Sequence, residues 1–253
     1  MVDRDDFLGV RLKLERAHHH IRHLEQIARE HIAFNVKSMA RQPNPKKWRS
    51  RSVGSAPPLH TPTILGDAIH NLRSALDHVY CALVISNGNK IDNRTSFPFY
   101  SNKHKAREHL YKNGKLRDDS PSEEAINFIL DEIRPFRDEG SDLYQLHKLD
   151  IDDKHKVLVG TMAYVHEAHY EIMDNRGNSV LDIYGPTIIV PHQFQNSGHI
   201  GLHPGQWLKL HNDPKEVFDI IFDRGTFEGE RVVSKINEVW DITKKAIDEL
   251  SHF

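Results

Sequence analysis

The sequence predicts an α+β fold, mainly a helical bundle, with a small antiparallel β-sheet inserted at about residues 156–211. Two observations lead to this class. Apolar residues recur at helical spacing in several segments, and short runs rich in β-branched and aromatic residues precede the last of these segments. The expected helices lie near 7–36, 62–85, 122–133 and 230–251.

The segment near 7–36 is expected to form a long amphipathic helix. Its apolar residues fall on one helical face, and neither Gly nor Pro interrupts the segment after Gly9. They are Leu8, Leu12, Ala17, Ile21, Leu24, Ala28, Ile32 and Phe34. Residues 37–63 then carry many prolines, which predicts an irregular loop.

The next two helices have recognisable ends. Thr61 or Thr63 can cap the helix near 62–85, and the sequence Ser-Asn-Gly-Asn ends it. Its apolar residues form one seam, made of Leu65, Ile69, Leu72, Leu76, Val79 and Leu83. Near 122–133, Ser-Pro-Ser-Glu-Glu offers a cap and early acidic residues. Another turn or two of helix is expected over Asp142–Leu149.

After Lys156 the pattern changes to short strands, separated by Gly, Asn, Asp or Pro. The expected strands lie at 157–159, 170–173, 180–184, 187–190 and 207–210. From about residue 230 the spacing is helical again. We expect a single α+β domain over residues 1–253, with the bundle formed by 1–150 and 230–253. The two-domain alternative would leave the last helix with only the sheet to cover its broad apolar face.

Composition excludes several classes of protein. The chain has 253 residues, of which 38% are hydrophobic and 28% charged, so it is neither disordered nor fibrous. Its net charge of -2 gives no global sign of a polyanionic partner, although 19 histidines are unusual. The single cysteine, Cys81, and the absence of a signal peptide or long apolar run lead us to expect a cytoplasmic protein. Walker, Gly-x-Gly-x-x-Gly, Gly-x-Ser-x-Gly and His-Glu-x-x-His motifs are missing from the sequence.

A polar stripe runs along the helix near 62–85, opposite its apolar seam. The stripe consists of Asp67, His70, Asn71, Ser74, Asp77 and His78, with Arg73 on its flank. Asp, Asn, Ser and His are mediocre helix formers, whereas a helical face with no functional role would be expected to carry Lys, Glu and Gln. Three interpretations stay open: a functional site, a solvated face, and a buried hydrogen-bond network between helices.

The stretch Arg73-Ser-Ala-Leu-Asp-His78 resembles the Arg-x4-His motif of HEPN ribonucleases, although Ser74 follows the arginine where these usually carry Asn, Asp or His. The resemblance implies a helical dimer that cuts RNA without a metal or other cofactor. It implies that Arg73 holds the scissile phosphate and His78 transfers protons, with Asp77, Asn71 and His70 in support. The longer string Gly-Asp-x-x-His-Asn-Leu-Arg-Ser-Ala-Leu-Asp-His, with the later Asp153-Lys-His155, also resembles a group of bacterial and phage-associated proteins and implies no activity.

Basic residues in the proline-rich loop favour RNA as the partner. They surround an aromatic ring, and no acidic residue occurs between Glu30 and Asp67. The expected RNA-binding residues are Lys46, Lys47, Trp48, Arg49 and Arg51, with Lys154 from the later charged cluster. Positive charges beside an aromatic side chain can follow a phosphate backbone and stack a base. The alternative is a loop whose charges only keep it soluble.

A divalent metal site is the rival prediction. Asp67-x-x-His70 places a carboxylate and an imidazole on one helical face, and one of His147, Asp153 or His155 could complete the ligand set. Such a mixed nitrogen and oxygen shell would suit zinc, iron or manganese. A third hypothesis makes the chain a non-enzymatic structural or interaction protein, in which the stripe is a packing network.

Overall fold

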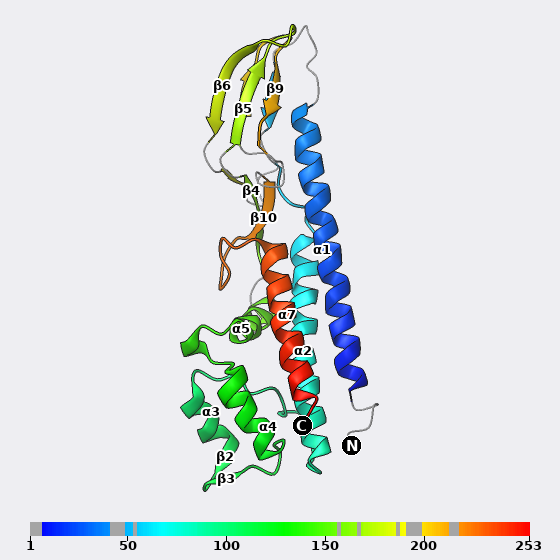
Figure 1. Ribbon diagram of the computed structural model, residues 1–253, viewed down its shortest axis with the longest axis vertical. Helices are drawn as coiled ribbons and strands as arrows, with labels where there is room; N and C mark the ends of the chain where they lie inside the picture. The colour runs from blue at the N-terminus through cyan, green and yellow to red at the C-terminus, as the bar shows by residue number, and fades with distance from the viewer. Residues whose placement is uncertain are drawn as a thin grey trace. The chain divides into compact units, whose positions relative to one another are not determined.

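The computed structural model describes residues 7–40, 49–52, 55–155, 158–165, 168–185, 188–190, 199–212 and 218–253. It confirms an α+β fold that is mainly helical and contains small antiparallel sheets (Figure 1). The chain divides into two compact units, which are described separately below. The first comprises Met1–Arg22, Thr63–Leu158 and Lys235–Phe253, and the second comprises His23–Pro62 and Val159–Ser234. That both belong to a single domain stays a prediction.

The long helices agree with the sequence pattern to within a few residues. They are α1 (Leu8–Ala40), α2 (Thr61–Ser86) and α7 (Val232–Leu250). The shorter helices are α3 (Lys103–Leu110), α4 (Glu123–Phe128) and α5 (Asp142–His155). Two further helical turns are the π-helical η1 (Ile129–Ile133) and the 3₁₀ turn η2 (Arg137–Glu139).

In the first unit, the beginning of α1 lies beside α2 and α7 (Figure 1). The ring of His18 on α1 contacts Trp240 on α7, with 5.1 Å between the ring centroids. The predicted apolar seam of α2 is buried, from Leu65 to Leu83. Because each fully buried Leu or Ile contributes about 1.5–3 kcal/mol, this seam is a main source of the unit's stability.

The smaller helices of this unit depart partly from the sequence prediction. Ser122 caps α4, as expected, and accepts a hydrogen bond from the backbone N–H of Ala125. Helix α5 extends to His155, well beyond the predicted turn or two. Its extra turn is supported by an ion pair between Lys154 and Asp150, four residues apart. Helix α3 was not predicted, because only Ala106 and Leu110 of it are buried.

The predicted strand at 157–159 is wrong for the residues that can be checked. Leu158 and Val159 are not in a strand, and residue 157 lies outside the described residues. Helix α5 continues to His155, and the next strand along the chain, β4, begins only at Thr161.

The first unit holds one small hairpin, of β2 (Tyr111–Lys112) and β3 (Lys115–Leu116). All other strands among the described residues belong to the second unit and pair antiparallel. They are β1 (Arg49–Ser52), β4 (Thr161–Val165), β5 (Ala168–Met173), β6 (Ser179–Gly185), β7 (Ile188–Val190), β8 (His199–Leu202), β9 (Trp207–Leu210) and β10 (Phe218–Phe222). The strand orders are β1-β8, β10-β4-β7 and β6-β5-β9.

The second unit corrects the predicted limits of the sheet region. Strand β10 lies beyond residue 211, where the prediction ended, and β1 comes from the proline-rich segment instead of the insertion. Four residues of the described strands, Tyr170, Ile172, Leu208 and Phe218, form a buried cluster that packs against Ile32 and Val36 of α1. The predicted strands at 170–173, 180–184 and 207–210 are confirmed, and β7 confirms 188–190 of the fourth.

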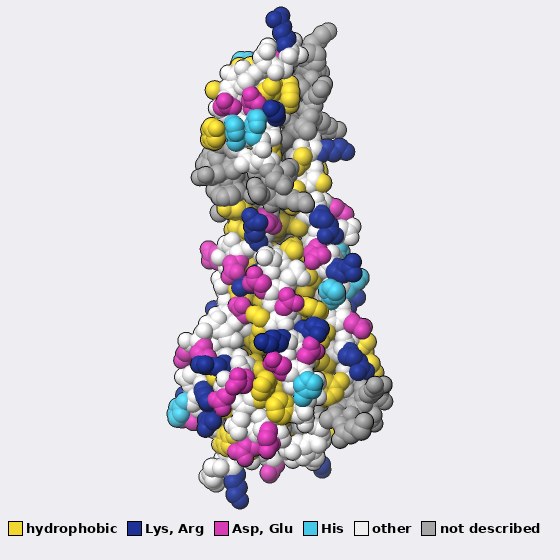
Figure 2. Space-filling view, viewed as in Figure 1, with side chains coloured by type: hydrophobic (Ala, Val, Ile, Leu, Met, Phe, Trp, Pro, Cys, Tyr) yellow, Lys and Arg dark blue, Asp and Glu magenta, His cyan; other side chains and the backbone are white. Residues whose placement is uncertain are grey.

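Charged side chains of both signs are mixed on the surface that Figure 2 shows, among the residues coloured by type. No helix within the described residues is long and apolar enough to cross a membrane. Because positive and negative side chains are mixed on this surface, a binding site for an anion would depend on a local arrangement of charges.

Candidate functional site

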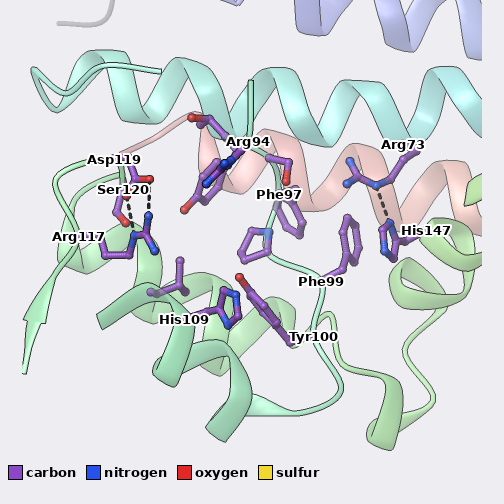
Figure 3. A pocket seen from close by; sticks show the side chains of 15 residues that line it. Arg73, Arg94, Phe97, Phe99, Tyr100, His109, Arg117, Asp119, Ser120 and His147 are labelled. Carbon is purple, nitrogen blue, oxygen red and sulfur yellow. Dashed lines mark hydrogen bonds and ion pairs between the residues drawn. The ribbon is translucent and has the colours of Figure 1, made fainter. Parts of the chain in front are cut away.

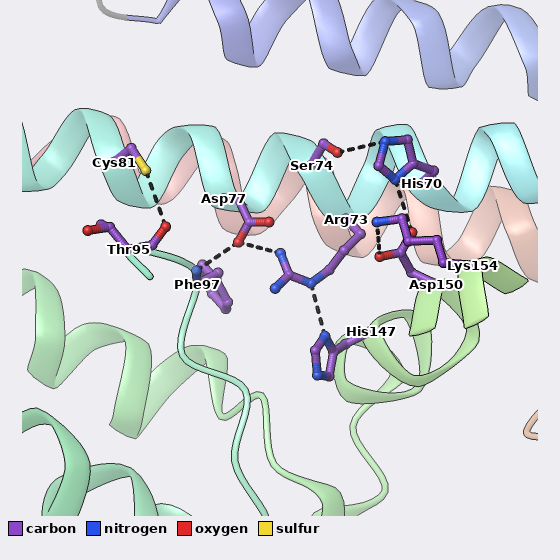
Figure 4. Close-up of polar contacts among 10 residues, drawn as sticks. All are labelled: His70, Arg73, Ser74, Asp77, Cys81, Thr95, Phe97, His147, Asp150 and Lys154. Atoms are coloured by element: carbon purple, nitrogen blue, oxygen red, sulfur yellow. Dashed lines mark hydrogen bonds and ion pairs between the residues drawn. The ribbon is translucent and has the colours of Figure 1, made fainter. Parts of the chain in front are cut away.

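Three residues of the polar stripe and its flank face α5 and the segment after α2, within the first unit. His70, Arg73 and Asp77 all contact groups outside their own helix (Figure 4). The solvated-face interpretation is wrong for Arg73, which is buried, whereas the side chains of His70 and Asp77 stay 42% and 35% exposed. Asn71 is buried, but its amide group donates to the backbone carbonyl of Asp67, one turn earlier in α2.

Arg73 is the centre of this arrangement. Only 7% of the residue is exposed, and its guanidinium group forms an ion pair with Asp77. Its Nε donates a hydrogen bond to Nδ1 of His147 on α5, at 3.1 Å. The guanidinium carbon also lies 4.5 Å from the centre of the Phe99 ring, as in a cation–π contact. Arg73 thus joins α2, α5 and the segment around residue 99.

Asp77 and Cys81 hold residues 95–97, which follow α2 in the chain, against this helix. The Asp77 carboxylate accepts a hydrogen bond from the backbone N–H of Phe97 at 2.9 Å, in addition to its ion pair. The thiol of Cys81, one turn further on, donates to the backbone carbonyl of Thr95. Burial and the nearby Asp77 carboxylate raise the pKa of this thiol, so it is not poised to act as a thiolate.

His147 is neutral at physiological pH. Burial, with a further contribution from the positive charge of Arg73, lowers the pKa of His147 to about 4. A neutral imidazole fits the geometry, because Nδ1 must carry a lone pair to accept the hydrogen bond from Arg73. The proton is then on Nε2. The imidazole also stacks on Phe99, with ring centroids 4.5 Å apart and planes 3° apart.

The lowered pKa predicts a loss of stability in acid. In the unfolded chain His147 binds a proton near pH 6.5, but in the folded chain only near pH 4, so acidification between these values favours unfolding. The slope is below about 1.4 kcal/mol per pH unit, because the ring is partly exposed. Urea unfolding at several pH values should show a flatter dependence in His147→Gln, which keeps an acceptor but does not titrate.

Burial also lowers the pKa of His31, in the second unit, and this residue is present in both the wild type and His147→Gln. Comparing the two proteins therefore isolates the contribution of His147. Equal slopes between pH 6.5 and 4 in the wild type and in His147→Gln would contradict the prediction.

A second set of contacts ties α5 to α2. Nδ1 of His70 lies 3.1 Å from the buried carboxylate of Asp150, which also accepts from Lys154 at 2.7 Å. Asp153 lies directly against Gly66 of α2, since a Cβ at Gly66 would be 2.5 Å from Oδ2 of Asp153. Gly66 therefore allows α5 to approach α2 closely. Residues 150–153 of α5 thus lie against the polar stripe of α2.

Arg73 and His78, the predicted catalytic pair, are not brought together within one chain. Five residues along a helix correspond to a rotation of about 140° between the two side chains. Arg73 contacts α5, whereas His78 is exposed and lies against Gly9 of α1, where a Cβ would be 2.7 Å from its Nδ1. Their joint role in catalysis stays a prediction.

Next to Arg73, the first unit contains a cavity of about 390 Å³, here named the Arg73 pocket (Figure 3). Its lining joins cationic, aromatic and hydroxyl side chains. The lining residues are Arg73, Tyr80, Arg94, Thr95, Ser96, Phe97, Pro98, Phe99, Tyr100, His109, Leu110, Arg117, Asp119, Ser120 and His147. Three guanidinium groups and a single carboxylate line it, so the charge of the lining favours an anion.

The two ends of the pocket differ. At one end Arg73 and His147 lie beside Phe99, and at the other the Arg117 guanidinium group lies near Asp119 and Ser120 (Figure 3). Arg117 makes two hydrogen bonds to Asp119, at 3.0 and 3.1 Å. No ion pair involving the Arg94 side chain is found among the described residues, so this group has charge to offer a ligand.

Of the predicted RNA-binding residues, Lys46, Lys47 and Trp48 lie outside the described residues, and the side chains of Arg49 and Arg51 are likewise not described. Lys154 is described and forms its ion pair with Asp150. Within the described residues, no three His, Cys, Asp or Glu side chains converge as metal ligands would. Asp67, His70 and His155 thus do not form the predicted metal site.

Most residues that line the pocket were not predicted from the sequence. The stretch Arg94-Thr-Ser-Phe-Pro-Phe-Tyr100 carried a usable signal, because three aromatic residues beside an arginine are unusual in a loop. Comparison of the chain with models of known protein families, with curated proteins and with solved structures found no match.

Proposed function

We propose that this chain binds RNA and that a nucleotide occupies the Arg73 pocket. The main observation in support of this proposal is that one cavity of about 390 Å³ combines guanidinium groups, aromatic rings and hydroxyl groups. A nucleotide offers a matching set, namely an anionic phosphate, a planar base and polar sugar hydroxyls. The preference for RNA over DNA rests on the resemblance of Arg73-Ser-Ala-Leu-Asp-His78 to the HEPN motif.

The pocket geometry favours binding over cleavage. The guanidinium group of Arg73 already contacts Asp77 and His147, so it supports the pocket wall more than it offers itself to a scissile phosphate. Arg94 and Arg117, at the other side, are better placed to receive a phosphate group, because they are more exposed. Arg117 would exchange part of its contact with Asp119 for the ligand.

RNA cleavage of the HEPN kind is a second proposal, favoured by the place of Arg73 in the lining of the same pocket. It requires a second copy of the chain to supply His78, as the resemblance implies. Incubation of wild-type protein and His78→Ala with an RNA pool in EDTA tests it: cleavage lost in the variant supports this proposal, and intact RNA in both samples leaves binding alone.

Photochemical cross-linking tests the location of the bound RNA. Irradiation of the wild-type protein with a short RNA containing 4-thiouridine, followed by trypsin digestion, should place the cross-linked nucleotide on the peptide 95–103, which holds Phe97, Phe99 and Tyr100. These rings line the pocket and can stack a base. A control without irradiation reports background. Cross-links confined to the peptide that begins at Trp48 would assign the RNA site to the basic loop and contradict the proposal.

A further inference from the structure

A second hollow adjoins the Arg73 pocket within the first unit. This lysine groove has a volume of about 820 Å³ and shares Arg117 and Asp119 with the pocket. Its other lining residues are Lys90, Ile91, Asp92, Lys112, Asn113, Lys115, Leu116 and Asp118. A ligand that fills the pocket and passes Arg117 would therefore enter the groove.

The lining of the groove carries four cationic side chains and three carboxylates, so cations outnumber acids by one. No ion pair is found within the described residues for Lys90, Lys112 or Lys115. Of the carboxylates, Asp119 accepts two hydrogen bonds from Arg117. Asp92 accepts from the backbone N–H groups of residues 94 and 95, and these hydrogen bonds, mainly the one from residue 94, lower its pKa and keep it ionised. Asp118 is the third carboxylate of the lining and is exposed. The groove thus presents ammonium groups to an incoming ligand.

The hairpin β2–β3 places two of these lysines in an unfavourable position. Lys112 and Lys115 are directly opposite each other in the antiparallel register. Like charges at such positions destabilise a hairpin. The tight turn between them has positive φ at both Asn113 and Gly114, as a two-residue hairpin turn requires, so the register cannot easily change to separate the charges. An anionic ligand between the ammonium groups would remove this repulsion.

We infer that the lysine groove carries the phosphate backbone of a single strand of RNA whose adjoining nucleotide occupies the Arg73 pocket. This inference rests on the proposed function. A single strand is required because a base can enter a cavity of this size only when it is not paired in a duplex. The smallest ligand that uses both hollows is thus a dinucleotide, and adenosine 5′-monophosphate fills the pocket alone.

The test compares two ligands and two double variants of the full chain. In Lys112→Gln/Lys115→Gln, we expect a single-stranded ten-nucleotide RNA to bind about 3- to 30-fold more weakly at low salt, with the log–log salt slope reduced by about 1.4. Binding of adenosine 5′-monophosphate should not change. In Arg94→Gln/Arg117→Gln, both ligands should bind more weakly. Fluorescence anisotropy measures the RNA and calorimetry the mononucleotide.

The outcomes separate the two claims. If Arg94→Gln/Arg117→Gln weakens both ligands but the lysine variant binds the RNA like the wild type, the groove inference fails and the proposed function stands. If neither variant affects either ligand, both fail. Equal loss of a duplex and of a single strand in the lysine variant would overturn the single-strand assignment. Thermal unfolding checks the fold, and the lysine variant should be at least as stable as the wild type, because the like-charge pair is removed.

Discussion

Replacing Asp77 with alanine should lower the free energy of unfolding by about 2–3 kcal/mol. The change removes the counter-ion of Arg73, whose side chain is only 9% exposed, and leaves a guanidinium group buried without its carboxylate. It also removes the acceptor for the backbone N–H of Phe97. The loss in the free energy of unfolding is limited because the Asp77 side chain is itself 35% exposed. Urea unfolding followed by circular dichroism measures it.

Two controls make this result specific to the contacts of Asp77. Asp77→Asn keeps an acceptor for Phe97 and should lose only about half as much. Asp67→Ala, an exposed position on the same helix, should change stability by less than about 0.5 kcal/mol. The double variant Arg73→Met/Asp77→Ala should be less destabilised than the sum of its single changes, because neither charge is left buried alone. Equal losses for Asp77→Ala and Asp67→Ala would show that the buried ion pair contributes nothing.

The parts of the fold that could be predicted from sequence are those whose pattern is local. The seam from Leu65 to Leu83 repeats at helical spacing, and its burial follows directly from the period. Helix α3 escaped prediction because only Ala106 and Leu110 mark its buried face. The pairing of β1 with β8 joins residues about 150 positions apart, and nothing in either short strand specifies the other.

The candidate site was predicted only in part, for a similar reason. The polar stripe and its flank include Arg73 and Asp77, which the structure joins in an ion pair, and their catalytic role stays a prediction. The spacing of the HEPN motif led to the prediction that Arg73 and His78 act together. The rotation of about 140° between the two side chains along the helix instead places them beside different neighbours. Besides Asp77, the partners of Arg73 are His147 and Phe99, and long-range packing places both of them.

The most direct test of the proposed RNA site is to measure the affinity for RNA after Arg94 and Arg117, the two exposed arginines of the pocket, are replaced. In Arg94→Gln/Arg117→Gln, a short fluorescent single-stranded RNA should bind about 10- to 100-fold more weakly than to the wild type at low salt. The physical reason is the loss of two exposed guanidinium groups that line one cavity. The salt slope should fall by about 0.7 for each phosphate contact removed.

Two matched proteins accompany this titration. Arg107→Gln/Lys245→Gln removes the same amount of charge at exposed positions outside both hollows and should bind RNA almost as well as the wild type. Arg117→Gln/Asp119→Asn removes an arginine without leaving its carboxylate unpaired, so a loss in this protein belongs to the guanidinium group. The proposed RNA site predicts a large loss of affinity for RNA only in the proteins whose pocket arginines are changed. RNA binding that is strong in the wild type and equally strong in Arg94→Gln/Arg117→Gln would contradict it.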